Sequence, residues 1–187
     1  MNIGIVGLGL IGGSLAKAFK TRTGHSVFGS DLNDETMLLA RLSGAIDAPL
    51  ADENMGEMDL LLIAIRPLAA ISWAKEHFKK LKRGACVVDM CGVKRAVQEE
   101  LEIIASENGV LYVGGHPMAG KERGKFQNAT ENLYVGASMI LTPGKDTTPD
   151  TLENLKEYEQ ALQNRDKEQL RALLKDGREK KTQAGGN

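Results

Sequence analysis

The chain has 187 residues, 42% apolar but only 4% aromatic, which predicts one domain plus an appendage with an aliphatic core. A net charge of −1 argues against a dedicated nucleic-acid or membrane-surface binder, and no run approaches the roughly 20 apolar residues of a membrane helix. The first residues lack the basic region of a signal peptide, and Cys86 and Cys91 lack metal-type spacing. We therefore expect a cytoplasmic protein with reduced thiols and no metal site.

Strand and helix signals alternate over the first 143 residues. Strands are predicted at residues 3–6, 26–30, 59–65, 85–89, 110–113 and 138–141, and helices at residues 10–20, 34–42, 69–81 and 93–107. Asn33 is the expected N-cap of the second helix. Continuous apolar runs such as residues 59–65 are typical of strands buried on both faces. The alternation predicts an α/β fold with a doubly wound, mostly parallel sheet and helices on both faces.

The composition changes after Pro143. Residues 144–150 read as a linker, and 15 of the 37 residues from 151 to 187 are charged. Leucines and a tyrosine recur at helical spacing before Asp166, and leucines recur at this spacing after it. Asp166 resembles the start of a capping box, and Gly177 suits a helix end. We expect a two-helix appendage over residues 151–181 and a disordered tail over residues 182–187.

A glycine fingerprint of the form G-x-G-x-x-G follows the first predicted strand and opens the first helix. Its residues are Gly7, Leu8, Gly9, Leu10, Ile11 and Gly12. In a Rossmann-type βαβ unit this turn carries the diphosphate of a dinucleotide on the free N–H groups of the helix. Asp31, at the end of the second strand, suits the ribose hydroxyls and repels a 2′-phosphate, which favours NAD over NADP. The alternative is a glycine-rich turn that holds no ligand.

Further candidate residues lie at the carboxyl ends of later strands, the edge where doubly wound sheets bind ligands. Ala64, Ile65 and Arg66 follow one strand and are candidates for cofactor binding, although Arg66 could equally be a surface arginine. Lys94 could orient an anionic substrate or be solvated. His116 follows another strand in a small-residue loop, where a neutral imidazole can act as a base or merely tie the loop together.

Three stretches of this sequence resemble the prephenate dehydrogenase family. They are residues 7–15, residues 89–95 (Asp-Met-Cys-Gly-Val-Lys-Arg) and residues 116–122 (His-Pro-Met-Ala-Gly-Lys-Glu), and the likeness extends to Leu141-Thr142-Pro143. The resemblance implies NAD-dependent oxidative decarboxylation of prephenate to 4-hydroxyphenylpyruvate, on the route to tyrosine. It also implies that His116 takes the proton of the ring hydroxyl as hydride leaves, and that Gly92, Lys94, Gly120 and Lys121 contact the substrate.

The sequence departs from the family pattern in three places. Gly92 stands where some members carry a serine that holds the substrate hydroxyl, and Gly124-Lys125 replaces the usual Ser-Gly. In the family, a helical domain that completes the substrate pocket and forms the dimer follows Leu-Thr-Pro, and the resemblance implies that most of it does not follow Pro143 in these 187 residues. Residues 151–181 resemble its last helices, and their bare apolar surface suggests a homodimer formed through them.

Two alternatives to a prephenate dehydrogenase stay open at this point. The first is a non-catalytic or partner-dependent NAD-binding module, because the substrate domain is missing. The second is an arogenate dehydrogenase, which would share every motif quoted above.

Overall fold

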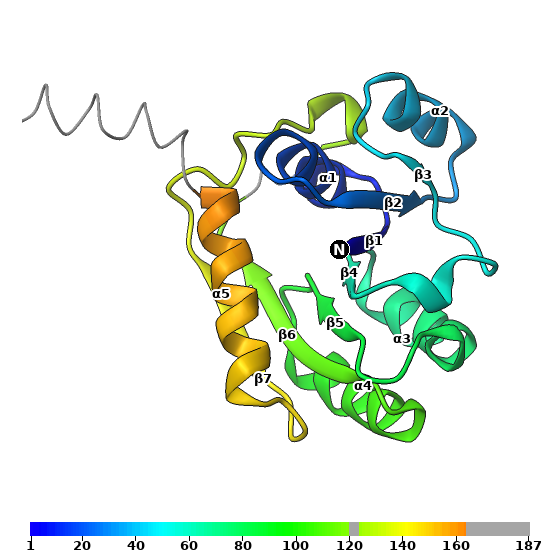
Figure 1. Cartoon of the computed structure of the whole chain (residues 1–187), viewed down its shortest axis with the longest axis vertical. Helices are drawn as coiled ribbons and strands as arrows, with labels where there is room; N and C mark the ends of the chain where they lie inside the picture. Colours follow the sequence, from blue (N-terminus) through cyan, green and yellow to red (C-terminus); the bar gives the residue numbers. More distant parts are fainter. Residues whose placement is uncertain (120–123, 164–187) are drawn as a thin grey trace, which may run out of the picture.

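The computed structural model describes residues 1–119 and 124–163. A seven-stranded sheet of order β3-β2-β1-β4-β5-β6-β7 forms the centre, parallel except for the β6–β7 pair (Figure 1). The strands are β1 (Asn2–Val6), β2 (Ser26–Ser30), β3 (Ala48–Pro49), β4 (Leu60–Ile63), β5 (Cys86–Asp89), β6 (Leu111–Pro117) and β7 (Met139–Pro143). The helices are α1 (Leu10–Arg22), α2 (Asp34–Leu42), α3 (Pro67–His77), α4 (Arg95–Asn108) and α5 (Pro149–Gln163). Three single 3₁₀ turns, η1 (Met55–Glu57), η2 (Phe78–Lys80) and η3 (Phe126–Asn128), complete the described part.

The two faces of the sheet are buried in separate apolar clusters, because successive side chains of a strand point to opposite faces. Leu60 and Leu62 of β4 join the cluster that contains Leu15 and Phe19 of α1. Leu61, between them in the strand, joins the cluster against α3 and α4. The predicted doubly wound α/β fold is confirmed.

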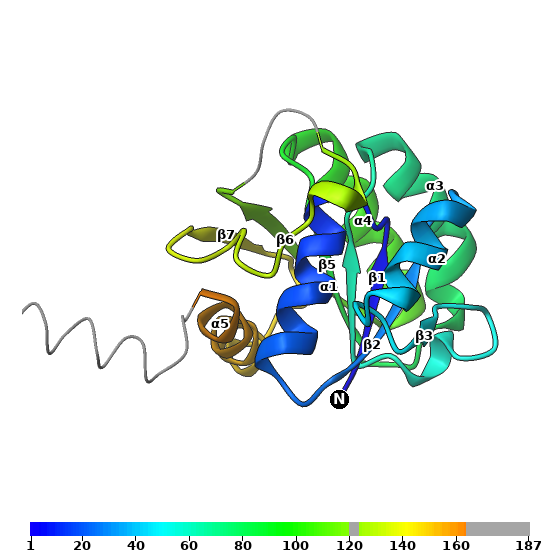
Figure 2. The same cartoon turned by 90° about the horizontal axis from the view of Figure 1, so that it is seen from above.

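Helix α5 covers part of the same face as α1. Leu155 is buried in the α1 cluster, and Leu152 and Tyr158 pack against it. Figure 2 shows α5 beside α1, at the edge where β6 and β7 lie. The helix begins at Pro149, inside the segment expected to be a linker, and its apolar stripe is part of the domain core. The predicted second helix and the predicted tail lie outside the described residues.

Several elements differ from the sequence-based expectation. Strand β3 was not predicted, and α3 begins at Pro67 because proline is favourable in the first turn of a helix. Strand β6 continues through Pro117, and β7 ends at Pro143 rather than Leu141. The predicted N-cap is confirmed, since the Asn33 side chain accepts a hydrogen bond from the Thr36 amide.

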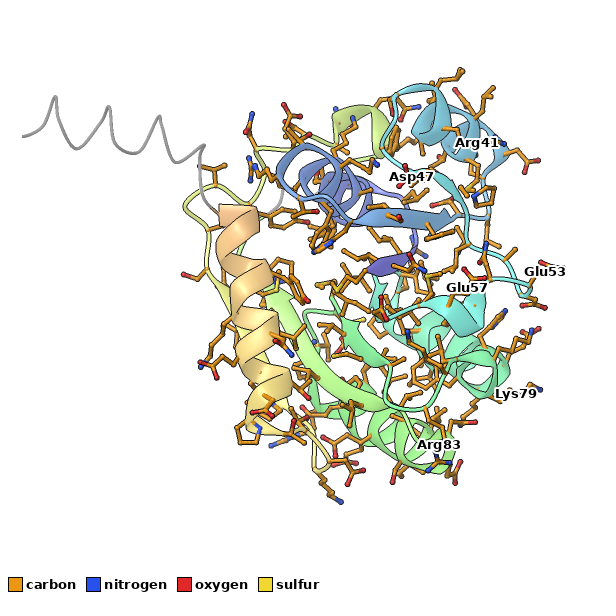
Figure 3. All side chains as sticks on the ribbon, viewed as in Figure 1. Arg41, Asp47, Glu53, Glu57, Lys79 and Arg83 are labelled. Atoms are coloured by element: carbon orange, nitrogen blue, oxygen red, sulfur yellow. The ribbon has the colours of Figure 1, made fainter. Side chains whose placement is uncertain are left out.

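The outside of the molecule is charged. Figure 3 labels six exposed charged residues on the outer elements and loops, namely Arg41, Asp47, Glu53, Glu57, Lys79 and Arg83. Within the described part of the chain, no helix is long and apolar enough to cross a membrane.

Candidate active site at the carboxyl edge of the sheet

The turn between β1 and α1 has the geometry of a phosphate-binding turn. Gly7 has φ +85°, and a Cβ there would lie 2.7 Å from the Ala64 carbonyl oxygen. A Cβ on Gly12 would lie 1.9 Å from the Gly7 carbonyl oxygen, so only glycine allows the helix to approach the strand this closely. The space around Gly9 is open. Helix α1 begins there without a side-chain cap or an acidic residue in its first turn, which leaves its N-terminal amides available to an anion.

The Asp31 carboxylate is held at the end of β2 by the turn itself. One oxygen accepts a hydrogen bond from the Leu8 amide at 2.8 Å, and the other accepts one from the Asn33 amide at 2.9 Å. The carboxylate is nevertheless partly exposed, and Leu32 beside it is fully exposed. Asp31 therefore ties the glycine turn to the end of β2 at the carboxyl edge of the sheet.

A cleft of about 1290 Å³ runs along this edge of the sheet. Most of the residues predicted for cofactor binding line it, namely Gly7, Gly9, Ile11, Asp31, Ala64, Ile65 and Arg66, whereas Leu8, Leu10 and Gly12 do not. Leu8 and Leu10 are buried, and Gly12 is the packing glycine already described. The cleft also includes Leu50, Met55 and Trp73, which the sequence analysis missed because they belong to a loop and a helix without a motif. An open glycine turn, an oriented carboxylate and apolar walls together fit a dinucleotide.

The sequence suggested that His116 lies in a loop after a strand. The structure instead places it inside strand β6. It pairs with Ile140 of β7, so a neighbouring strand fixes its backbone. Its side chain is partly exposed, while its Nδ1 atom is buried and has no hydrogen-bond partner among the described residues. A Cβ built on Gly92, which lines the cleft, would lie 3.3 Å from His116 Cε1. The imidazole is thus next to the cofactor cleft.

Lys94 is bound to a buried carboxylate rather than free for a substrate. Its Nζ atom lies 2.7 and 2.8 Å from the two oxygens of Asp89, whose side chain is completely buried. The same ammonium group donates to the Gly115 carbonyl, one residue before His116. The expectation that Lys94 contacts an anionic substrate stays a prediction, and in the structure the ammonium group is paired with Asp89. The positive charge of Lys94 is matched by the negative charge of Asp89, next to the strand that carries His116.

Asp89 also accepts hydrogen bonds from the Tyr112 hydroxyl at 2.6 Å and from the Cys91 amide at 2.9 Å. Burial, followed by the nearby carboxylate, raises the pKa of Tyr112 well above its usual range. The sequence analysis named neither Asp89 nor Tyr112 as a site residue. The available signal was an aspartate at the end of an otherwise apolar strand, since a buried charge needs partners.

Cys91 lies in the cleft wall and is buried. Desolvation, with a further contribution from Asp89, raises the pKa of its thiol to about 12. A protonated thiol is a poor nucleophile, which agrees with a packing role. Gly120 and Lys121, predicted to contact the substrate, lie outside the described residues. No cluster of His, Cys, Asp or Glu that could hold a metal ion occurs in residues 1–119 and 124–163.

Comparison with known proteins identifies the family. The model of the prephenate dehydrogenase nucleotide-binding domain matches residues 15–165. The prephenate dehydrogenase of Bacillus subtilis (strain 168) is 31% identical over 156 residues, which cover 81% of this chain and 42% of that protein. The chain thus spans less than half the length of this curated relative.

Solved structures agree in fold. The arogenate dehydrogenase of Synechocystis superposes with a TM-score of 0.81 at 30% identity, covering 88% of this chain and 58% of that one. The prephenate dehydrogenase of Aquifex aeolicus, solved in complex with hydroxyphenyl propionate and NAD+, superposes with a TM-score of 0.78 at 30% identity, covering 87% and 57% of the two chains. The match covers most of the sequence, and the chain belongs to the prephenate dehydrogenase family through its nucleotide-binding domain.

Proposed function

We propose that this chain is the NAD-binding and base-carrying part of a dehydrogenase that converts prephenate to 4-hydroxyphenylpyruvate. The observation that carries the proposal is the proximity of His116 to Gly92, a residue of the dinucleotide cleft. The base and the cofactor site are thereby neighbours at one sheet edge. The NAD+ bound to the Aquifex aeolicus relative supports the choice of cofactor, and Asp31 supports NAD over NADP.

His116 is the residue that moves a proton in this reaction. Bound NAD supplies the hydride acceptor. The imidazole accepts the proton of the ring hydroxyl as the C–H bond on the same carbon breaks, and the hydroxyl becomes a carbonyl. The ring carboxylate then leaves as CO₂, the electrons of the broken C–C bond complete the aromatic ring, and the carbonyl oxygen takes up a proton to become the phenol hydroxyl of the product. Asp89 and Lys94 hold the strand behind His116, so the base keeps one position.

Arogenate is the alternative substrate, because the Synechocystis relative is an arogenate dehydrogenase at the same 30% identity. A non-catalytic or partner-dependent NAD-binding module is the alternative function. The neutralisation of Lys94 by Asp89 favours it, since a dianionic substrate needs a cation beside the base. Under that alternative, another polypeptide would supply the cation.

We further propose a cytoplasmic location and a homodimer formed through the C-terminal helices, and sedimentation of the purified chain tests the dimer.

The proposed function is tested by NADH formation from prephenate and NAD, with arogenate in parallel. We expect His116→Asn to lower turnover by at least about 100-fold, the loss typical of removing a general base. NAD affinity should remain, because His116 lies beside the cleft and not in the phosphate turn. His25→Asn is the matched control, because His25 lies just before the amino end of β2, at the opposite edge of the sheet.

The outcomes separate the alternatives. Turnover that persists in His116→Asn contradicts the assignment of the base. A wild-type chain that binds NAD but turns over neither substrate supports the binding module.

A further inference from the structure

The connection between β6 and β7 lies against α1. We call its described part, residues 124–138, the strap. It leaves the sheet beside His116 and returns beside it, since the Met118 amide donates to the Ser138 carbonyl at 2.8 Å and Pro117 pairs with Met139. Figures 1 and 2 both show the yellow-green turn of the strap next to α1. One segment therefore connects the strand of the proposed base to the helix of the proposed phosphate site.

The strap contacts the first turns of α1 through polar groups. The Tyr134 hydroxyl donates to the Ile11 carbonyl at 2.8 Å, and the Thr130 amide donates to Ser14 Oγ at 3.1 Å. Tyr134 and Ser14 are buried. Ile11 itself lines the cleft, two residues after Gly9. These bonds act on the turn whose amides would meet a phosphate.

Close packing reinforces the hydrogen bonds. A Cβ on Gly13 would lie 2.7 Å from the Phe126 ring, and a Cβ on Gly124 would lie 2.8 Å from the Leu10 side chain. Lys17 donates to the Ala129 carbonyl at 2.7 Å and lies 4.6 Å from the centre of the Phe126 ring. Two glycines thus let the helix and the strap approach more closely than alanine would allow.

We propose that the strap positions the phosphate-binding turn of α1, and that Tyr134 is the positioning residue through which it acts on the cofactor diphosphate. The inference rests on the proposed nucleotide site. The physical reason is that amides stabilise an anion only when they are held in its direction before it binds. Tyr134 does not touch the cofactor in this account. It restrains the first turn of α1 through the Ile11 carbonyl.

The test compares ligands with and without a diphosphate on the full chain. In Tyr134→Phe, which keeps the ring and removes the hydroxyl, we expect ADP and NAD to bind about three- to tenfold more weakly, as for loss of one hydrogen bond. Adenosine, which lacks phosphate, should bind as it does to wild type. Asn132→Ala is the matched control, because it removes a strap bond to Arg22 at the last turn of α1, far from the glycines.

Several results would overturn the proposal. They are an unchanged ADP affinity in Tyr134→Phe, an equal loss of adenosine affinity, or the same loss of ADP affinity in Asn132→Ala. Ser14→Ala, which removes the acceptor of the Thr130 amide, gives a second variant should Tyr134→Phe not fold, and it should weaken ADP and spare adenosine in the same way. A wild-type chain that does not bind ADP overturns the phosphate turn itself. None of these measurements requires turnover, so failure of the dehydrogenase proposal is seen separately.

Discussion

Gly92 and His116 are neighbours at the carboxyl edge of the sheet. A Cβ on Gly92 would lie 3.3 Å from His116 Cε1 and 3.8 Å from His116 Nδ1. The buried Nδ1 has no hydrogen-bond partner among the described residues. A short hydroxyl side chain at position 92 is therefore placed near His116 Nδ1. The backbone of Gly92 is not in the left-handed region and so permits a larger residue, but a Cβ 3.3 Å from Cε1 requires the His116 ring to shift by a few tenths of an ångström.

We predict that Gly92→Ser increases kcat/KM for the substrate by about three- to tenfold, the gain expected from one new hydrogen bond near the base. Gly92→Ala is the matched control, because it adds the same Cβ without the hydroxyl. Steady-state kinetics of both variants make the measurement. Equal rates in the two variants would show that the hydroxyl does nothing and that position 92 acts only through its size.

The Asp89–Lys94 pair leads to a prediction about stability. Removing the ammonium leaves a completely buried carboxylate without its cationic partner, although the Tyr112 hydroxyl and the Cys91 amide still donate to it. We expect Lys94→Met to lower the free energy of unfolding by about 3 kcal/mol, as for other broken buried pairs. Urea titration measures it. The double variant Asp89→Asn/Lys94→Met should recover part of the loss, and a double variant as unstable as the sum of the singles would contradict the coupling.

Asp31 and Leu32 set the expected cofactor preference. Asp31→Ser removes the charge that repels a 2′-phosphate, and Leu32→Arg places a guanidinium at a fully exposed position beside it. We expect the double variant to bind NADP at least about tenfold more tightly than wild type does, from one new charge-assisted contact. Titration with NAD and NADP measures the ratio. An unchanged ratio would place the ribose away from Asp31.

The two cysteines give a prediction about how fast their thiols react at a given pH. Burial raises the pKa of Cys86 and of Cys91 to about 12. Only the thiolate reacts with disulfide reagents, so near pH 8 the native thiols are roughly one ten-thousandth ionised and react very slowly. We expect the reaction to accelerate in denaturant, where both thiols regain an ordinary pKa. Rapid modification of the folded chain at this pH would contradict the burial of these side chains.

Where the sequence predicted the fold well, local pattern and tertiary structure agree. The apolar run at residues 59–65 is long enough to require burial on both faces, and the structure buries all of β4. Strand β3 escaped prediction because it is two residues long and is defined only by its pairing with β2. The Gly-Gly-His-Pro end of β6 escaped for a similar reason. Glycine and proline disfavour strands locally, and pairing with β7 overrides that preference.

In the candidate site, too, some residues are predicted by a local pattern and others are identified only by the tertiary structure. The glycine fingerprint and Asp31 are local signals, and the structure brings both to the cleft. The pairing of Lys94 with Asp89, by contrast, follows from the burial of the Asp89 carboxylate in the tertiary structure. Asp89 and Tyr112 lie on adjacent strands, and only the register Val87↔Tyr112 places the hydroxyl beside the carboxylate. A sequence read one residue at a time contains no measure of that juxtaposition, so it favours the simpler view of a lysine that faces solvent or substrate.

Helix α5 shows whether the chain after Pro143 is a separate appendage or part of the nucleotide-binding domain. If residues 151–181 were an appendage, Leu155 would contribute little to the nucleotide-binding domain. In the structure Leu155 is buried in one cluster with Leu15 and Phe19 of α1, over the apolar face of β4 and β5. We therefore expect Leu155→Ala to lower the free energy of unfolding by about 2–4 kcal/mol through the lost apolar contacts and the cavity left behind. Asn154→Ala, one residue away and exposed, is the matched control and should change it by less than about 0.5 kcal/mol.

Denaturant titration followed by Trp73 fluorescence reports on the other face of the sheet, where Trp73 packs. A single transition shifted by Leu155→Ala would show that α5 and the sheet unfold together, whereas an unshifted Trp73 transition would show that α5 is a separate unit.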